Sequence, residues 1–491
     1  MSRIIPTIYF LLIFTSLCFA QLDLKVHSPK KMQKDLKTLL ETFEGHPDPF
    51  TKISESKFNA IVDSVRNNIS TEMDEIDFYK NMSRIVASIH DGHTSLYLRG
   101  GWLENMRKKN GVFPYEVYLT NEHKLYITSS YIKDQIPLGA EVLEINGLQI
   151  SDFIDEITPY ISCETIPFRN DQITTSFEKM LYLVFKQVDK LEFKVRQIEE
   201  QNFIVETIDY DLWKDQKKDL RKDRDKRIAK GKPYDYQVIK PGIAKIKIFS
   251  FHTYDIKKYN IFLRKTFKDI KKQNIHSLII DVRGNYGGWP KMSSKLFHYI
   301  HNGYFKTLAR STTKISSPYR RSFTDSNTAL RNANNIDFRQ SRHLLNLEEI
   351  LYGKLDTYYE EDVIFNESPV TEDYEFYGDC FLLIDRKSFS AASSFASTFQ
   401  CYQMGTIIGE PTGGTKIFRA NAFTKKLSKT DLVVRMSSTK CFSTCYNGDD
   451  EPIQPNLVVV PTILDRVYKV DSQLNVAIQL INKLQKQKNG E

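Results

Sequence analysis

The spacing of apolar residues predicts helices near the N-terminus and a parallel sheet in the second half of the chain. Between residues 28 and 90, apolar positions recur every three or four residues in three successive stretches, which predicts three amphipathic helices. From residue 236 onward, short apolar runs of strand length alternate with helical stripes. Such alternation predicts a parallel sheet with covering helices, because parallel strands require crossover connections. The predicted fold class is α/β.

A third pattern fills the region between these two. Residues 115–119 and 124–127 alternate apolar and polar positions like strands, and residues 136–147 have the pattern of a strand, a tight turn and a second strand. Residues 195–207 predict a closing hairpin. We therefore expect a small β-rich module here.

The first 20 residues have the composition of a secretory signal peptide. Arg3 precedes an apolar run from Ile4 to Phe19, and the small residue Ala20 closes it. The alternative is a membrane anchor, which needs about 20 apolar residues, more than this run supplies. We therefore predict cleavage and export, either to a periplasm or out of the cell.

These patterns divide the chain into consecutive units. The predicted units are a signal peptide (1–20), a helical N-terminal region (21–104), a β-rich module (105–207), a charged connector (208–235), an α/β core (236–470) with a polar insertion (305–375), and a C-terminal helix (471–491).

The charge of the chain is concentrated in the connector. The formal net charge is +8, and residues 214–232 contribute ten Lys or Arg against four Asp, a net +6. Because basic and acidic residues are interleaved there, this segment predicts a solvated connector rather than a nucleic-acid surface.

Five cysteines follow the signal peptide, so at least one thiol has no partner within the chain. Cys441 and Cys445 could pair locally. The same Cys-x-x-x-Cys spacing lacks the second pair that a structural zinc site needs, so we predict no metal.

Two predicted strands end in residues suited to chemistry. Residues 277–281 are followed by glycines at 284, 287 and 288, and residues 381–384 are followed by Ser388 and Ser390. Because active sites of open α/β sheets lie beyond the carboxyl ends of the strands, these two ends should meet. They offer backbone N–H groups for an oxyanion and a hydroxyl nucleophile.

Four motifs in order resemble those of the tail-specific (C-terminal-processing) serine peptidases, in particular the branch that includes the tricorn core protease. They are Asp-Gly-His-Thr at 91–94, Asp-Val-Arg-Gly-Asn-Tyr-Gly-Gly at 281–288, Ser-Phe-Ser-Ala-Ala at 388–392 and Gly-Glu-Pro-Thr-Gly-Gly at 409–414. The resemblance implies a diverged PDZ-like module at 105–207, an α/β core of the crotonase/ClpP-like kind, and no cofactor.

The resemblance assigns the nucleophile and two alternative bases. It maps the family nucleophile onto Ser390. A lysine base would fall at Thr415, and the neighbouring Lys416 is one residue off, which in an extended segment turns the side chain to the opposite face. The tricorn-like alternative is a histidine base at His93, although Gly92 stands where that pattern has a serine.

The resemblance also places the remaining groups. The acid that orients the histidine maps to Asp449, with Asp450 and Glu451 as alternatives. The oxyanion would be bound by backbone N–H groups of Gly287 or Gly288 and of Ala391. The predicted site residues are therefore Ser390, His93, Asp449, Asp450, Glu451, Lys416, Gly287, Gly288 and Ala391.

The sequence therefore predicts an exported serine endopeptidase that cleaves polypeptides through an acyl-enzyme. The alternative is a non-catalytic relative of the same fold that binds peptides or apolar ligands. The family's PDZ-like module binds substrate C-termini, so a polypeptide is the expected partner in both cases.

Overall fold

The computed structural model describes residues 24–133, 135–220, 227–228, 230–252, 255–324, 347–361 and 374–488. The predicted signal peptide lies outside these residues, as do parts of the connector, of the insertion and of the extreme C-terminus. Within the described part of the chain, no helix is both long and apolar enough to cross a membrane.

Three amphipathic helices form the N-terminal region, as their spacing predicts. They are α1 (Pro29–Phe43), α2 (Glu55–Asn68) and α3 (Glu75–Ala87). The Asp74 carboxylate caps α3 by accepting hydrogen bonds from the N–H groups of Ile76 and Asp77. Two short strands, β1 (Val26–His27) and β2 (Met73–Asp74), pair beside these helices.

The module that follows contains both a sheet and helices. Its strands pair in the order β4-β5-β6-β8-β9, with β7 attached to β6. The strands are β4 (Tyr115–Leu119), β5 (Leu125–Ser130), β6 (Glu141–Ile145), β7 (Leu148–Gln149), β8 (Lys190–Arg196) and β9 (Glu200–Glu206). The helical elements are α4 (Trp102–Asn110), α5 (Ile150–Ile157), η1 (Thr158–Tyr160), α6 (Ile166–Thr175) and α7 (Phe177–Phe185).

The α/β core predicted from the alternating pattern is confirmed. Its sheet has the order β10-β11-β12-β15-β16-β21, in which β10 is antiparallel to β11 and all later pairs are parallel. The strands are β10 (Tyr234–Lys240), β11 (Ile243–Ile248), β12 (Ser277–Asp281), β15 (Asp379–Ile384), β16 (Thr406–Gly409) and β21 (Leu457–Val458).

Helices cover both faces of this sheet. On one face α10 (Ile256–Lys272), α11 (Pro290–Ile300) and α16 (Ala391–Cys401) bury Phe267, Leu296 and Phe395 against the strands. On the other face α18 (Ser472–Lys488) packs Ala477 and Ile481. Because both faces are covered, the central strands are apolar throughout, and all five residues of β12 are buried.

The predicted polar insertion contributes strands to a second sheet of the core. This antiparallel sheet has the order β14-β13-β20-β17, in which β13 and β14 come from the insertion. The elements are β13 (Leu308–Ile315), α12 (Ser317–Thr324), α15 (Leu347–Tyr352), β14 (Thr357–Glu361), β17 (Ile417–Ala420) and β20 (Thr439–Ser443). The connector likewise begins with a helix, α8 (Tyr210–Leu220), and α17 (Ile463–Tyr468) precedes α18.

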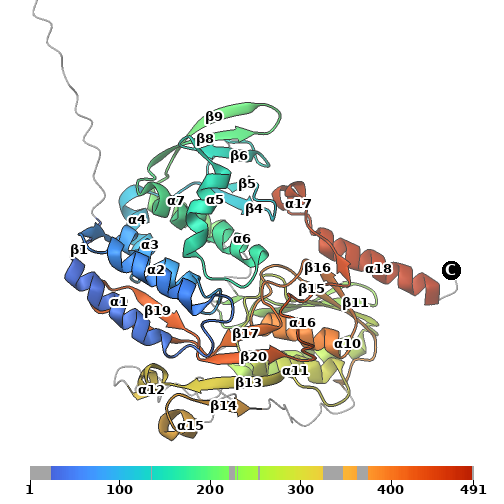
Figure 1. Ribbon diagram of the computed structural model, residues 1–491. Helices are drawn as coiled ribbons and strands as arrows, with labels where there is room; N and C mark the ends of the chain where they lie inside the picture. Colours follow the sequence, from blue (N-terminus) through green and yellow to red (C-terminus); the bar gives the residue numbers. More distant parts are fainter. Residues whose placement is uncertain are drawn as a thin grey trace, which may run out of the picture.

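A third small sheet joins the two halves of the chain. The strand β3 (Ser95–Tyr97) from the N-terminal region pairs with β19 (Val433–Met436), which in turn pairs with β18 (Phe423–Lys426). Figure 1 shows β19 and α1 side by side, with the blue helices of the N-terminal region packed against the orange strands of the core. This pairing fixes the residues just before β3 at the edge of the core.

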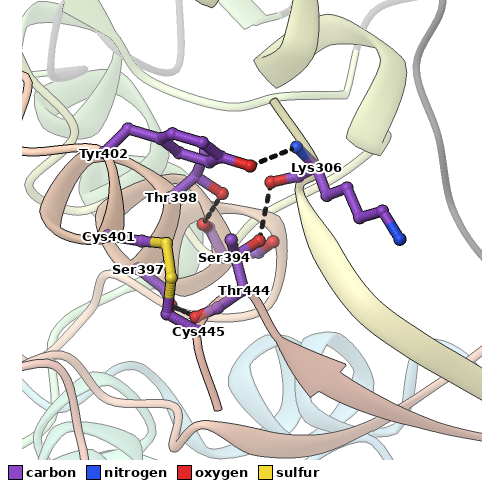
Figure 2. Close-up of a disulfide and its surroundings, with 8 residues drawn as sticks. All are labelled: Lys306, Ser394, Ser397, Thr398, Cys401, Tyr402, Thr444 and Cys445. Carbon is purple, nitrogen blue, oxygen red and sulfur yellow. Dashed lines mark hydrogen bonds between the residues drawn. A yellow bond between two sulfur atoms is a disulfide. The ribbon is translucent and has the colours of Figure 1, made fainter. Parts of the chain in front are cut away.

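The cysteine pairing differs from the local one considered from the sequence. The disulfide joins Cys401, the last residue of α16, to Cys445 (Figure 2). Cys441 lies within β20 and is buried without a disulfide partner, because its side chain packs into a small apolar cluster with Leu308 and Phe418. The bridge ties the end of α16 to the loop after β20.

Candidate active site

Ser390 lies on a sharp turn between β15 and α16. Its backbone has φ 54° and ψ −123°, a region that a residue with a side chain rarely adopts. It occupies the N-cap position of α16, yet its side chain makes no capping hydrogen bond. A strand, a strained turn and a helix together present a hydroxyl above the sheet in this way in known nucleophile elbows. The position of Ser390 therefore suits a nucleophile better than a helix cap.

The neighbouring serine, Ser388, holds the two strand ends together. Its buried hydroxyl donates to the carbonyl of Val282, 3.1 Å away, and accepts from the N–H of Asp385. The Asp385 carboxylate in turn accepts from the N–H of Gly284 at 2.9 Å. The glycine segment after β12 is thus attached to the serine segment after β15, as their positions in the sequence predict.

Gly287 lies directly against the nucleophile candidate. A Cβ atom added to Gly287 would stand 2.6 Å from Ser390 Cβ and 2.9 Å from the Ala391 nitrogen, so no side chain fits there. The N–H of Gly287 donates to Asn285 Oδ1 at 2.8 Å. The N–H of Ala391, at the first position of α16, has no acceptor within its own helix. Of the three predicted donors, Gly288 and Ala391 therefore suit an oxyanion hole best.

His93 is held in place by the turn that precedes β3. The buried carboxylate of Asp91 accepts hydrogen bonds from the N–H of His93 (2.9 Å), from Thr94 Oγ1 (2.5 Å), from Ser437 Oγ (2.7 Å) and from His46 Nε2 (3.2 Å). Burial alone would raise the pKa of Asp91, but the hydrogen bond and charge of His46 outweigh it and hold that pKa below its usual range. Asp91 thus acts as the anchor of this turn.

The imidazole of His93 is buried and lies beside the nucleophile loop. It stacks on the ring of Phe389, the residue before Ser390, with centroids 4.6 Å apart. Burial lowers the pKa of His93 to about 4, with Asp91 opposing the shift and Arg435 and Arg419 adding to it. The ring is therefore neutral at pH 7, which a general base requires.

Neither ring nitrogen of His93 has a hydrogen-bond partner within the described residues. The Ser390 hydroxyl and the imidazole are thus not hydrogen-bonded to each other here. Catalytic hydrogen bonds often tighten only when substrate is bound, so this geometry is compatible with a serine–histidine pair.

Glu164 completes this cluster, although it was not among the site residues predicted from the sequence. Its carboxylate is buried and has no side-chain partner among the described residues, and the backbone N–H groups of Gly92 and of Glu164 itself lie near enough to favour its ionised form. One ligand atom each of Asp91, His93 and Glu164 lie within 4.8 Å of one another. Burial, with the nearby charge of Asp91 second, raises the pKa of Glu164 to about 8. The only hint in the sequence is that Glu164 is the single charged residue in the stretch 157–168.

Glu164 also explains the glycine that replaces the expected serine at 92. A Cβ at Gly92 would stand 2.5 Å from Glu164 Oε2 and 2.9 Å from Phe389 Cζ. The space that a side chain at 92 would fill is therefore occupied by the glutamate. The two features form one structural unit.

The same cluster has the ligand types of a cation site. Its three ligand atoms lie within 4.8 Å of one another, a spacing that a cation could bridge. The two oxygens of Asp91, however, already accept hydrogen bonds from four protein donors between them. The orphaned atoms are those of His93 and Glu164 alone, which favours a hydrogen-bonded pair over metal coordination.

The alternative base and the predicted acids lie together at the start of β17. Lys416 Nζ is 2.7 Å from Asp449 Oδ1, and this hydrogen-bonded ammonium lowers the pKa of Asp449. Asp450 pairs with Lys52 at 2.9 Å and accepts from the N–H of Ile417, while the carbonyl of Glu451 accepts from the N–H of Lys416. Since the His93 ring nitrogens have no partner, none of these acids is hydrogen-bonded to His93 here.

A hydroxyl on a strained turn, glycine and helix-terminal N–H groups beside it, and a neutral buried imidazole define the class of serine-type peptidases. Residues 242–458 match the model of peptidase family S41. This part of the chain is accordingly similar to the serine-type peptidases of family S41, in agreement with the resemblance of the four motifs to the tail-specific proteases.

Solved structures show the same overall fold. The crystal structure of mature CPAF is similar with a TM-score of 0.65 at 14% identity, covering 92% of this chain and 98% of that one. Mature CPAF complexed with lactacystin gives 0.62 at 14% identity, covering 94% and 100%. No curated protein matches the chain in sequence.

Proposed function

We propose that this protein is an exported serine endopeptidase in which Ser390 is the nucleophile and His93 the general base. The observation that supports it most directly is the strained Ser390 turn beside an imidazole that burial keeps neutral. In the reaction, His93 accepts the proton of Ser390 Oγ as that oxygen forms a bond to a peptide carbonyl carbon. The imidazolium then protonates the leaving amine, and water hydrolyses the acyl-enzyme.

The oxyanion of the tetrahedral intermediate would be bound by the N–H groups of Gly288 and Ala391. Each such donor is worth roughly 2.7–4 kcal/mol of transition-state stabilisation. The N-terminal end of α16 adds its partial positive charge at the same place, because Ala391 is its first residue.

Export is supported by two features of different kinds. The first 20 residues have the composition of a signal peptide. The Cys401–Cys445 disulfide is of a type that persists in oxidising compartments. We infer a periplasmic or secreted protein, and N-terminal sequencing of the protein from its native host would show a chain beginning at Gln21.

The test of the peptidase function is Ser390→Ala, with Ser394→Ala as its matched control. Ser394 lies on the same helix, but its hydroxyl donates to the carbonyl of Thr307 at 2.8 Å, away from the site. The wild type and Ser394→Ala should hydrolyse an unfolded polypeptide and react with a fluorophosphonate probe, whereas Ser390→Ala should do neither. A folded wild type that does neither, over pH 5–10, would contradict the proposal.

The second candidate is a non-catalytic peptide-binding protein, and one observation favours it. The hydrogen bond between Ser390 and His93 is not formed in this structure. Peptide binding by calorimetry that is equal in the wild type and in Ser390→Ala, with no turnover, would support this candidate.

A further inference from the structure

We propose that Glu164, a residue of the PDZ-like module, is the acid that positions the imidazole of His93. This inference rests on the proposed function and deepens it, because it assigns the third member of the site to a different domain. It replaces the acids expected at 449–451, which are engaged elsewhere.

The segment that carries Glu164 is fixed to the core on both sides. Ser162 Oγ donates to the carbonyl of Asp91 at 2.7 Å, and Thr165 Oγ1 donates to the carbonyl of Gly413 at 3.0 Å. These two bonds bracket Glu164 and direct it over the turn that holds His93. The segment is thus docked on both sides of the site rather than loosely attached.

An aromatic contact reinforces this docking. Phe168, in the first turn of α6, stacks on Phe389 with centroids 4.2 Å apart, and His93 stacks on Phe389 as well. The three rings therefore connect the module, the nucleophile loop and the base. Glu164 is attached to the same unit, four residues before Phe168.

The hydrogen-bonding capacity of the cluster singles out one pair. Buried polar atoms in native proteins almost always have a partner. Among the described residues, both ring nitrogens of His93 lack one, neither carboxylate oxygen of Glu164 has a side-chain partner, and the two groups lie within 4.8 Å of each other. A hydrogen bond between them would give one ring nitrogen of His93 and one oxygen of Glu164 a partner.

The other acids near His93 are already committed. Asp91 binds four donors, and its Oδ1 is 3.9 Å from His93 Nδ1. Asp449 forms an ion pair with Lys416, and its side chain is 39% exposed. Glu164 is the acid that is both buried and available.

The pair has two protonation arrangements with different consequences. When Glu164 is ionised, it accepts the N–H of one ring nitrogen, and the other nitrogen keeps its lone pair for the Ser390 proton. When Glu164 is protonated, its O–H donates to the ring, and the remaining nitrogen carries the hydrogen and cannot act as a base. The site is therefore active only with Glu164 ionised.

The charged groups that face this pair are Asp91 from the same turn as His93, Arg419 on β17 and Arg435 on β19. The charge of Asp91 opposes ionisation of Glu164, and that of Arg419 favours it. With the pKa of Glu164 at about 8, the active fraction increases as pH rises through about 8.

The experiment compares Glu164→Gln, Glu164→Asp and Asp449→Asn, each checked for folding by circular dichroism. Glu164→Gln should lower kcat roughly 10³-fold or more, as loss of an orienting acid does in other serine peptidases. It should also remove the rise in kcat/KM near pH 8. Glu164→Asp should restore part of kcat, and Asp449→Asn should keep both activity and pH profile within a few-fold.

A second readout does not depend on turnover. The imidazole resonances of His93, identified by comparison with His93→Gln, should shift near pH 8 in the wild type and not in Glu164→Gln. If that inflection is missing in the wild type or persists in Glu164→Gln, the inference is overturned. If it behaves as expected but wild type and Ser390→Ala are equally inert, the pairing stands and the proposed peptidase function fails instead.

Discussion

The imidazole of His93 lies against the ring of Phe389, at 4.6 Å between centroids and 27° between planes. Because Phe389 immediately precedes Ser390, this contact holds the His93 ring beside the Ser390 turn. Phe168 also stacks on the Phe389 ring, with centroids 4.2 Å apart, so the same ring contacts the β-rich module. One side chain thus connects three regions that are far apart in the sequence.

Replacing the Phe389 ring should lower activity by more than the accompanying loss of stability explains. In Phe389→Leu we expect kcat to fall about 10–100-fold, since a displacement of catalytic groups by about 1 Å can cost 10²-fold. The loss of packing should lower the free energy of unfolding by about 1–2 kcal/mol. Steady-state kinetics and urea unfolding measure the two effects.

The control for that variant is Phe399→Leu. Phe399 is fully buried on α16, the helix that follows Phe389, but it packs in the core on the sheet and not against His93. It should lose similar stability while the folded fraction keeps its kcat. Equal loss of kcat in both variants would show that the Phe389 ring has no special role.

Restoring a side chain at position 92 should disrupt the site. In Gly92→Ser the new Cβ would stand 2.5 Å from Glu164 Oε2, so we expect a destabilisation of about 1–3 kcal/mol. Shortening the neighbour in Gly92→Ser/Glu164→Ala should recover part of that loss. A double-mutant cycle from urea unfolding measures this coupling. Additive effects would mean that the two residues do not compete for space.

The buried carboxyl predicts how stability changes with pH. The folded-state pKa of Glu164 is about 8, against an ordinary value of 4.5. Between these values the folded chain retains a proton that the unfolded chain has released, so the contribution of Glu164 to stability falls as pH rises through this window. Glu164→Gln cannot ionise and should gain about 1–3 kcal/mol on the wild type between pH 4.5 and 8.

The reference for this measurement is His93→Gln. His93 changes stability in the opposite direction, because its contribution is lost as pH falls rather than as pH rises. Its folded pKa of about 4 lies below the ordinary 6.5, so the stability that it contributes is present above 6.5 and is lost as pH falls toward 4. Thermal unfolding of both variants and the wild type at pH 4, 6 and 8 separates the two effects. A pH-independent difference for Glu164→Gln would contradict the burial of that carboxyl.

The disulfide should stabilise the end of α16. Cys401 and Cys445 are 44 residues apart, and a bridge closing a loop of this size typically contributes about 2–4 kcal/mol. We expect Cys401→Ser/Cys445→Ser to lower Tm, and a reductant to lower the Tm of the wild type but not that of the double variant. Cys380→Ser, which removes a buried thiol without a disulfide, is the control.

Features that depend on neighbouring residues could be predicted from the order of the amino acids. The apolar run of β15 followed by small residues predicted Ser390 at a turn between strand and helix, and the glycines after β12 predicted a close approach of the backbone to that turn. Both follow from local rules, since period, turn chemistry and the carboxyl ends of parallel strands are encoded within a few residues. The alternation of strands and helices likewise predicted the α/β core.

Which side chains from distant parts of the sequence come into contact depends on the tertiary structure. The pairing of β3 with β19, over three hundred residues apart, brings the His93 turn to the core, and the docking of the module brings Glu164 to the same place. It also paired Cys445 with Cys401 rather than with the nearby Cys441. Such contacts depend on shape and burial summed over several elements, so no local periodicity records them. Glu164 lies between two helices in the sequence, and only the three-dimensional structure shows its buried carboxylate beside the unpartnered imidazole of His93.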